Sequence, residues 1–478
     1  MHLSLTGAVF IPIILAVFLL RPSRLEELLI CTAVFQGAAV FNAGGGFAVG
    51  LSPYFFTASL LAMRVGFKWT SGKIRFRRGE FAQTHLQITA LFIAWCVVSA
   101  FLLPFLFEGT PVDSPRAGAE AVFYLALPLH WSFSNAGQAG YMVLNFIVLL
   151  AFADCAGRRL DRLIKAFTYS GVIVLLVGLY QMASFRFGLP FPDSFFNSNG
   201  AWAQNYNQMI GGGWHRVSST FVEPSDAGGF LSCWLLFELI LANQGSTKRT
   251  RHWIFAIVGC VVLLATTSTT GYATVAFILA AMGARLAYEA IRRGRILIRT
   301  GLALCAVVVV GIAFLVGGHG VSLLDAVLFN KGGSSSAVHR MGTVWRAFAV
   351  MRDTYGLGAG LGSNRAFGTL AYICSNLGVF GLAVFLFMIG HLSQNTFSYL
   401  KASPGSSATK VALIACSAAL AADLLSLVIS GAEISNPRIW VVWGILIASL
   451  RAQIHAADSE PYETVSQASA DALYARSA

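Results

Sequence analysis

The stretch LQITALFIAWCVVSAFLLPFLF, residues 86–107, contains no charged side chain and is long enough to cross a hydrocarbon core as a helix. Comparable apolar stretches recur along the whole chain. Of its 478 residues, 56% are hydrophobic and only 11% are charged, and the mean hydropathy is +0.69. A soluble domain of this size does not have such a composition. The sequence therefore predicts an all-α fold, a polytopic transmembrane helical bundle.

We expect about thirteen membrane-spanning helices. They cover approximately residues 4–20, 28–43, 50–66, 86–107, 138–156, 166–187, 226–243, 253–268, 271–289, 300–317, 368–392, 410–430 and 438–451. The second and third come from one apolar stretch that is too long for a single crossing, and we divide it at the glycines 44–46. The first lacks the basic start and the cleavage site of a signal peptide, so we expect the protein to retain it. Together the spans form a single membrane domain, residues 1–451.

The basic residues indicate how the chain is oriented. Clusters of Lys and Arg alternate with loops that contain few of them, and the positive-inside rule makes the basic loops cytoplasmic. The N-terminus is then outside and the C-terminus inside, and the net charge of +12 does not indicate nucleic acid. Three long loops face outward, at about 108–137, 188–225 and 318–367. The polar tail, residues 452–478, is predicted to be disordered in the cytoplasm.

The first outer motif is GGGWHRVSSTFVEPSD, residues 211–226, directly before an apolar span. Its last residues resemble the start of a helix, whose first turn presents unpaired N–H groups that favour anions. Arg216 would add a fixed positive charge, and Glu223 at the mouth of this site is a candidate general base. An ordinary capped helix start, with Arg216 as the ion-pair partner of Glu223, is the alternative. The candidate substrate-binding residues of this motif are Trp214, His215, Ser225 and Asp226.

The second outer motif, residues 337–353, has the periodicity of an amphipathic helix. The apolar stripe consists of Met341, Val344, Trp345 and Phe348, and the opposite face carries His339, Thr343, Arg346 and Asp353. We expect this helix to lie on the membrane surface with its basic edge over a cavity. Its arginines are suited to a diphosphate, because a guanidinium can bond two oxygens at once, and Thr343 is a further substrate-binding candidate. Contact between these cations and lipid headgroups is the alternative.

A glycine-rich segment, GLGAGLGSNR at residues 356–365, follows this motif. It lacks the lysine and the preceding strand of a nucleotide-binding loop. We expect its glycines to let backbone amides approach a ligand or to form a tight re-entry into the membrane. Arg365 joins the other cations as a substrate-binding candidate. A Thr/Ser-rich segment, residues 266–271, is interpreted as a tight polar turn between two spans, with a ligand contact as the alternative.

Isolated polar residues in and near the spans have two interpretations each. Asp154, Glu238 and Asp423 would either serve a proton relay or pair with packing partners. Aromatic residues of the second outer loop would stack on sugar rings or lie at the membrane interface. The eight cysteines have no metal-site spacing, and we interpret them as packing residues. The sequence therefore predicts no metal site.

Several of these motifs occur in a recognisable order. RVSSTFVEPS at 216–225 is followed by the Thr/Ser-rich turn, a large outer loop with an Arg- and Trp-containing helix, GLGAGLGS at 356–363 and SNLGVFG at 375–381. This order resembles the bacterial O-antigen polymerase and ligase superfamily, especially its Wzy-type exopolysaccharide polymerase members. The resemblance covers about residues 165–450 in the order of elements.

The resemblance implies a metal-independent glycosyltransferase at the outer side of the bacterial inner membrane, working without a cofactor. Its donor and acceptor would be undecaprenyl-diphosphate-linked glycans, and its candidate partners are membrane lipids, a chain-length regulator and a flippase. By this resemblance Arg216, Arg340 and Arg346 hold the diphosphate leaving group. We expect Glu223 to orient or deprotonate the acceptor hydroxyl, with His339 as the alternative.

Two other functions compete with a polymerase. A ligase of the same superfamily would transfer finished glycan to lipid A core or to protein, but ligases commonly carry a histidine where this chain has Asn364 and Arg365. A flippase or transporter of lipid-linked sugars would need cations near mid-membrane, whereas the motifs above place them at the outer rim.

Overall fold

The computed structural model describes residues 2–43, 49–74, 76, 80–113, 126–155, 159–200, 208–210, 214–243, 248–293, 335–402, 408–430 and 433–454. In these ranges the chain is mostly helical, and its few strands are two or three residues long. The predicted all-α class is confirmed. Most of the predicted tail, residues 452–478, lies outside these ranges.

The helices and strands divide as follows. The first half contains α1 (Leu5–Leu20), the 3-10 helix η1 (Pro22–Arg24), α2 (Leu25–Thr32), α3 (Pro53–Thr70), α4 (Phe81–Leu106), α5 (Phe133–Asp154), α6 (Leu160–Phe187) and α7 (Asp193–Phe196). The second half contains α8 (Pro224–Asn243), α9 (Arg249–Ala265), α10 (Thr269–Arg293), α13 (Ser335–Asp353), α14 (Thr369–Ala402), α15 (Ala408–Ser430) and a last helix over residues 437–454. The antiparallel strand groups are β1 (His2–Leu3) with β2 (Phe41–Ala43) and β3 (Val49–Leu51), β4 (Pro111–Asp113) with β5 (Ala126–Pro128), and β6 (Met209–Ile210) with β7 (Trp214–His215).

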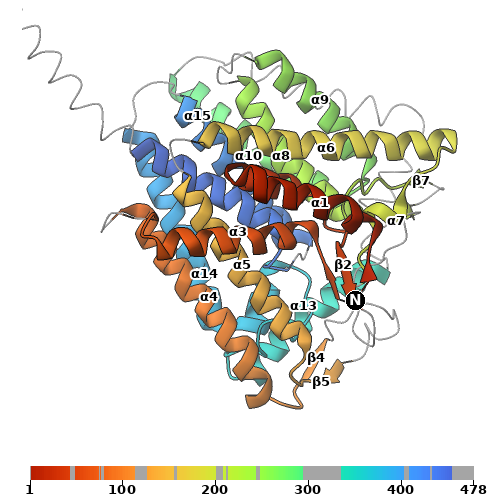
Figure 1. Ribbon diagram of the computed structural model, residues 1–478, viewed down its shortest axis with the longest axis vertical. Coiled ribbons are helices and arrows are strands. Elements are labelled where there is room, and N and C mark those ends of the chain that lie inside the picture. Colours follow the sequence, from red (N-terminus) through yellow and green to blue (C-terminus); the bar gives the residue numbers. More distant parts are fainter. Residues whose placement is uncertain are drawn as a thin grey trace, which may run out of the picture.

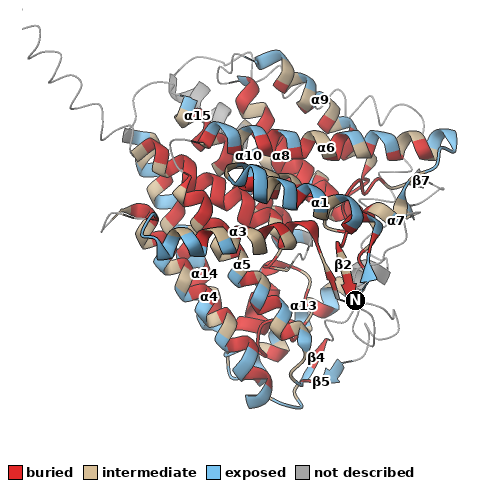
Figure 2. Ribbon diagram, in the orientation of Figure 1, coloured by how far each residue is buried: buried red, intermediate tan, exposed pale blue. Residues whose placement is uncertain are grey.

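Helix α8 lies at the centre of the bundle. It packs against α15, α9 and α10, and its side chains Trp234 and Phe237 are fully buried. Helices α4, α5 and α14 pack together on another side, at the lower left of Figure 1. Figure 2 shows that buried residues gather on the faces that these helices turn toward each other. The core is therefore formed between helices, as in other helical membrane proteins.

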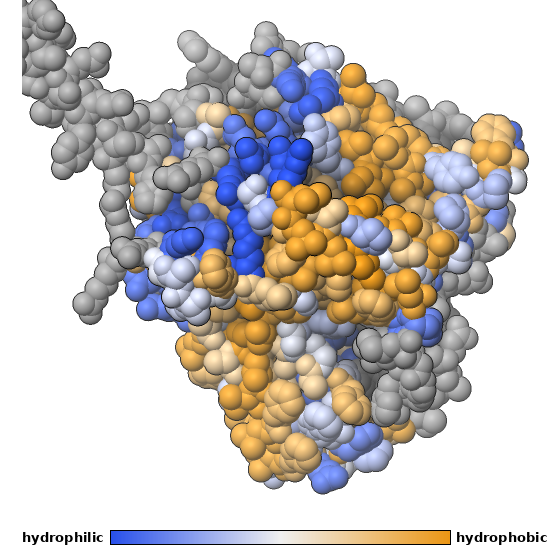
Figure 3. Space-filling model, viewed as in Figure 1, coloured by the Kyte–Doolittle hydropathy of each residue, from blue (hydrophilic) through white to orange (hydrophobic). Residues whose placement is uncertain are grey.

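The outward faces of the helices are apolar. Leu19 and Leu20 at the end of α1, and Phe105 and Leu106 at the end of α4, are all at least 60% exposed. Figure 3 shows apolar side chains over α1 and over the lower part of α4. An apolar surface of this extent is unfavourable in water and indicates contact with lipid.

The number of membrane-spanning helices differs from the prediction. Among the described residues, six helices are long and apolar enough to cross a membrane, or seven if α1 and the bent η1–α2 segment form one span. Thirteen spans are therefore not supported. Helix α9 has 17 residues, fewer than the six long apolar helices have. The predicted span 300–317 lies outside the described ranges.

The predicted span 28–43 is wrong for a physical reason. Helix α2 ends at Thr32, and the chain then forms β2, which pairs with β3 in antiparallel register. The N–H of Val40 donates to the carbonyl of Leu51 at 2.7 Å. These inter-strand hydrogen bonds take up the backbone groups that a continuous helix would have used.

The isolated acids of the spans have basic partners. Lys68 Nζ lies 2.5 Å from Asp154 Oδ2, and His252 Nδ1 lies 2.5 Å from Glu238 Oε2. Asp423 on α15 forms an ion pair with Arg438 of the last helix, and both side chains are almost completely buried. The packing-partner interpretation accounts for all three acids, because a buried charge is tolerated mainly when it is paired.

Candidate functional site

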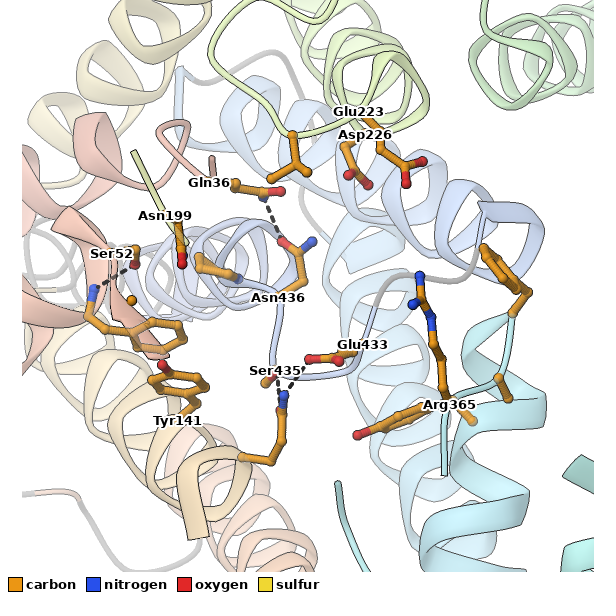
Figure 4. A pocket seen from close by; sticks show the side chains of 18 residues that line it. Gln36, Ser52, Tyr141, Asn199, Glu223, Asp226, Arg365, Glu433, Ser435 and Asn436 are labelled. Atoms are coloured by element: carbon orange, nitrogen blue, oxygen red, sulfur yellow. Dashed lines mark hydrogen bonds between the residues drawn. The ribbon is translucent and has the colours of Figure 1, made fainter. Parts of the chain in front are cut away.

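A cavity of about 210 Å³ lies where the start of α8 meets α5, the glycine-rich segment and the residues before the last helix. Figure 4 shows Glu223 and Asp226 at the start of α8, with Arg365 approaching from another wall and Glu433 lower in the view, beside Ser435. Gln36, Ser52 and Asn199 lie on the remaining side. Two of the predicted catalytic and binding motifs, those of Glu223 and Arg365, therefore reach the same cavity although they are far apart in sequence.

The start of α8 has the geometry of a capped helix. Glu223 precedes Pro224, and its carbonyl accepts hydrogen bonds from the N–H groups of Asp226 and Ala227 at 3.1 Å each. The hydroxyl of Ser225 donates to Glu223 Oε2 at 2.8 Å. Proline suits the first helical position because its missing N–H has no intrahelical partner there. This arrangement fixes the Glu223 carboxylate at the edge of the cavity, and Ser225 is placed to orient it.

Arg438 of the last helix holds the start of α8 in place through hydrogen bonds. Its guanidinium donates to the carbonyl of Asp226 at 3.0 Å and to Ser426 Oγ at 3.0 Å, in addition to its ion pair with Asp423. Gly229 is required beside it, since a Cβ at this position would lie 2.9 Å from Arg438 Nη1. The buried ion pair thus sets where α8 begins, and with it the place of Glu223 and Asp226.

Arg365 is held in place by the glycine-rich segment. Gly358 (φ +85°) and Gly362 (φ +81°) adopt left-handed conformations, and a Cβ on Gly358 would lie 2.7 Å from the backbone of Asn376. The N–H groups of Ala359 and Gly360 donate to carbonyls of α14 at 2.8 and 2.9 Å. The glycines therefore let this segment pack against α14, which is broken at Gly378, instead of leaving backbone amides for a ligand.

The electrostatic surroundings of Arg365 connect it to both acids of the cavity. Burial lowers the pKa of Arg365, and the carboxylates of Glu433 and Glu223 raise it again. Its guanidinium lies 5.6 Å from the centre of the Phe367 ring, within range of a cation–π contact. A guanidinium keeps its charge even when buried, so the cavity contains a permanent cation facing carboxylates.

Arg216 and Arg340 lie close to this cavity without lining it. Arg216 Nε donates to Thr267 Oγ1 at 3.0 Å, in the turn between α9 and α10. Burial lowers the pKa of Arg216, Glu223 raises it and Arg340 lowers it, so these three charges act on one another. The Arg340 guanidinium lies 4.9 Å from the centre of the Phe367 ring, and its buried Nε has no hydrogen-bond partner among the residues described.

The Thr/Ser-rich segment is the tight turn that the sequence predicts. It joins α9 to α10, and Thr267 adopts a left-handed conformation (φ +46°) that is uncommon outside glycine. Arg216 donates to the carbonyl of Thr267 at 3.4 Å, in addition to its hydrogen bond to the Thr267 hydroxyl. This turn therefore fixes the direction of the Arg216 side chain.

Arg346 and Thr343 on α13 have structural partners. Arg346 forms an ion pair with the buried carboxylate of Asp113 in β4. Burial raises the pKa of Asp113, and the charge of Arg346 opposes this shift. Thr343 is buried, and its Oγ1 accepts the N–H of Phe367 at 3.4 Å. Both side chains thus attach α13 to the parts of the chain that support Arg365.

The apolar stripe of α13 lies on the surface of the molecule. Met341, Trp345 and Phe348 are 58%, 68% and 42% exposed, whereas Ala347 and Val350 are buried against the protein. This agrees with an amphipathic helix whose apolar edge faces lipid. The side chains of His339 and Trp214 lie outside the described set. His215 stacks on Phe185 with ring centres 4.5 Å apart and is not among the residues that line the cavity.

Sequence reasoning missed several cavity residues. Gln138 on α5 donates to Glu433 Oε2 and accepts the hydroxyl of Ser435 at 2.5 Å. Burial raises the pKa of Glu433, and the hydrogen bond from Gln138 opposes this shift. Glu433, Ser435 and Asn436 belong to a short connection between two apolar helices, and no spacing pattern marked them. The sequence signal that could have identified Glu433 is a carboxylate in a connection of only a few residues between two apolar helices.

In the parts of the chain that the structure describes, no group of three or more His, Cys, Asp or Glu side chains is placed to hold a metal ion. The charged groups of the cavity are guanidiniums and carboxylates. Comparison with known proteins gives no assignment: no protein-family model matches the chain, and no curated protein matches it significantly.

Proposed function

We propose that this protein polymerises lipid-linked oligosaccharide repeat units into an exopolysaccharide or O-antigen, at the outer face of the bacterial inner membrane. Its donor and acceptor would be undecaprenyl-diphosphate-linked glycans. One observation carries the proposal: Glu223 and Asp226 face Arg365 across a cavity at the start of the apolar helix α8. Arg216 and Arg340 lie within electrostatic range of these groups.

The proposed reaction is a substitution at the anomeric carbon of the donor. An acceptor hydroxyl forms a new C–O bond to this carbon, and the bond to the diphosphate oxygen breaks. The diphosphate leaves with the electron pair, and the hydroxyl proton passes to the carboxylate of Glu223. A carboxylate fixed by a hydrogen bond from Ser225 is suited to this role, because its orientation is set before the substrate binds.

The guanidinium groups have the complementary role in this proposal. Negative charge builds up on the diphosphate as it leaves, and fixed cations stabilise it without reorganisation. Arg365 lines the cavity, and Arg216 and Arg340 would complete the anion site. Arg346, which the resemblance places at the diphosphate, has Asp113 as its partner, and here we give it a structural role.

The proposal can be tested in cells that depend on this protein for their polymer. We expect E223Q and R216A to abolish long-chain polymer while the variant proteins stay at wild-type levels in the membrane. R352A is the matched control for arginine removal, because the Arg352 side chain is 78% exposed and pairs with its neighbour Asp353. Glycan chain length on gels is the readout.

The same experiment separates the competing functions. Full polymer yield and chain length in both E223Q and R216A would contradict the proposal. Normal polymer that is no longer attached to lipid A core or protein would indicate the ligase reaction instead. Repeat units that accumulate on the cytoplasmic side would indicate a flippase.

A further inference from the structure

The cavity has two walls of different chemistry. Glu223, Asp226, Glu433 and Arg365 make one wall charged. The other wall is uncharged: it consists of amide, hydroxyl and aromatic side chains, namely Gln36, Ser52, Phe55, Tyr141, Asn199 and Asn436. Figure 4 shows Gln36, Ser52 and Asn199 grouped on the side away from Arg365. The proposed function gives roles to Glu223 and Arg365 of the charged wall and leaves the uncharged wall unexplained.

The hydrogen bonds of the uncharged wall determine which of its polar atoms are available. The backbone N–H of Arg438 donates to Asn436 Oδ1 at 3.1 Å, so this atom must be the amide oxygen. Gln36 Nε2 donates to the same oxygen at 2.9 Å. This leaves Gln36 Oε1 as an acceptor and Asn436 Nδ2 as a donor. Neither atom has a hydrogen-bond partner among the residues described.

An adjacent donor and acceptor suit a particular kind of ligand. A hydroxyl group both donates and accepts a hydrogen bond, and neighbouring hydroxyls on a sugar ring present both functions side by side. Neutral amides recognise them without the strong charge that would favour an anion. The uncharged wall also has an aromatic part, in which Phe55 and Tyr141 are stacked with ring centres 3.8 Å apart. The apolar faces of sugar rings pack on such aromatic groups.

The backbone at Gly37 and Gly50 packs closely against Asn199 of the uncharged wall. Asn199 is 4% exposed, and a Cβ on Gly50 would lie 2.1 Å from Asn199 Oδ1. The N–H of Asn199 donates to the carbonyl of Gly37 at 3.0 Å, next to Gln36. Three segments from distant parts of the sequence thus hold amide side chains at one side of the cavity, which makes it a built surface.

We propose that the uncharged wall binds a neutral sugar ring of the acceptor glycan, with Gln36 Oε1 and Asn436 Nδ2 bonding neighbouring hydroxyls. This inference rests on the proposed function and extends it. Arg365 of the charged wall binds the diphosphate, and the uncharged wall selects the sugar whose hydroxyl attacks. The division predicts that the two walls bind their ligands separately.

Two probes test the walls independently on the full-length protein in lipid nanodiscs. Saturation-transfer NMR measures binding of a panel of neutral methyl glycosides (gluco, galacto, manno and N-acetylgluco). Calorimetry measures binding of inorganic pyrophosphate. We expect at least one glycoside to bind, and Q36M to weaken it by about tenfold, as for a lost hydrogen bond in a partly buried site. Q36M leaves pyrophosphate binding unchanged, whereas R365A removes it. N395L is the matched amide control, because Asn395 Nδ2 bonds the carbonyl of His391 within α14, outside the cavity.

The outcomes distinguish the two proposals. Pyrophosphate binding without binding of any glycoside would overturn the sugar wall and leave the proposed function standing. Glycoside binding without pyrophosphate binding would support the sugar wall and contradict the diphosphate site. Equal glycoside affinity in Q36M and the wild-type protein would contradict the hydrogen bond to Gln36, and Y141A then tests whether this wall binds the sugar at all. If Y141A also leaves glycoside binding unchanged, the inference is overturned.

Discussion

Arg346 on α13 and Arg365 in the glycine-rich segment both contact Asp113, but the surroundings of their guanidinium groups differ. The Asp113 carboxylate pairs with Arg346, while the Asp113 carbonyl accepts the N–H of Arg365 at 2.9 Å. Arg346 therefore has its charge satisfied by a neighbour, and the Arg365 side chain extends into the cavity. The comparison teaches that a cation's position relative to the cavity, more than its residue type, indicates whether it can reach a substrate.

Among the changes that test this comparison, removing Arg365 is expected to have the largest effect. R365A takes a fixed cation out of the cavity, and the loss of one charge-stabilising group reduces such reactions by about 10²–10³-fold. We expect polymer formed per molecule of membrane protein to fall by this factor with little loss of folded protein. R365K should recover only part, because an ammonium lacks the planar fork of donors. Activity of R365A above half of the wild-type level would break the comparison.

The support of Arg365 can be tested separately from its charge. G358A places a side chain where φ is +85° and where a Cβ would meet the Asn376 backbone at 2.7 Å. The left-handed conformation alone costs about 1–2 kcal/mol for a non-glycine residue, so we expect lower thermal stability together with a large loss of polymer. G342A is the matched control: a Cβ on Gly342, in α13, meets nothing within 4 Å. Equal behaviour of the two variants would show that the glycine-rich segment does not position Arg365.

Removing Arg346 should affect stability more than activity. R346A leaves the Asp113 carboxylate buried without its ion partner, which costs about 1–3 kcal/mol. Polymer per folded molecule should stay near the wild-type level, and the double variant R346A/D113N should regain most of the lost stability. Unfolding midpoints in detergent measure this. An R346A protein of normal stability but without activity would contradict this interpretation and favour a direct contact between Arg346 and the diphosphate.

The R346A variant also predicts a pH dependence. Burial raises the pKa of Asp113, so folding favours its protonated form. The stability from this carboxyl is present below its unfolded pKa of about 4 and is lost as pH rises through the folded value. Without Arg346 the folded pKa rises further. The difference in Tm between wild-type protein and R346A should therefore widen from about pH 5 to about pH 7.5, and D113N should abolish it.

The smallest effect is expected at Thr343. T343V removes the acceptor for the N–H of Phe367, a long hydrogen bond of 3.4 Å, and should destabilise the protein by no more than about 1 kcal/mol. Polymer yield should change less than twofold. T396V is the control, since Thr396 is a buried threonine of α14 distant in sequence from this contact. A loss of activity as large as that of R365A would give Thr343 a direct part in the site.

The membrane class and most helix positions could be predicted from the sequence. The stretch 86–107 lies within α4 except for its last residue, because a long apolar run leaves the chain few ways to satisfy its backbone groups. The span 28–43 could not be predicted, since apolar composition does not reveal the pairing of β2 with β3. The number of spans was overestimated because short apolar helices were counted with long ones.

The site could be predicted only in part. Glu223 and Arg365 stand in motifs with several polar residues close together, and both line the cavity. Gln36, Asn199 and Asn436 are single amides in separate segments, and only the fold brings them together. Arg346 was selected because its residue type suits a diphosphate, but Asp113, more than 200 positions away, is its partner. Pairings at such sequence distance leave no local pattern.

The Asp423–Arg438 pair has a consequence for biosynthesis. Asp423 sits in an apolar helix, and neither charge is tolerated in hydrocarbon by itself. We therefore expect α15 to insert stably only after the helix over residues 437–454 has left the ribosome, so that the two enter the bilayer as a unit. Cysteine-accessibility mapping of a chain truncated at residue 436 checks this: α15 should be labelled by aqueous reagents there and protected in the full-length chain.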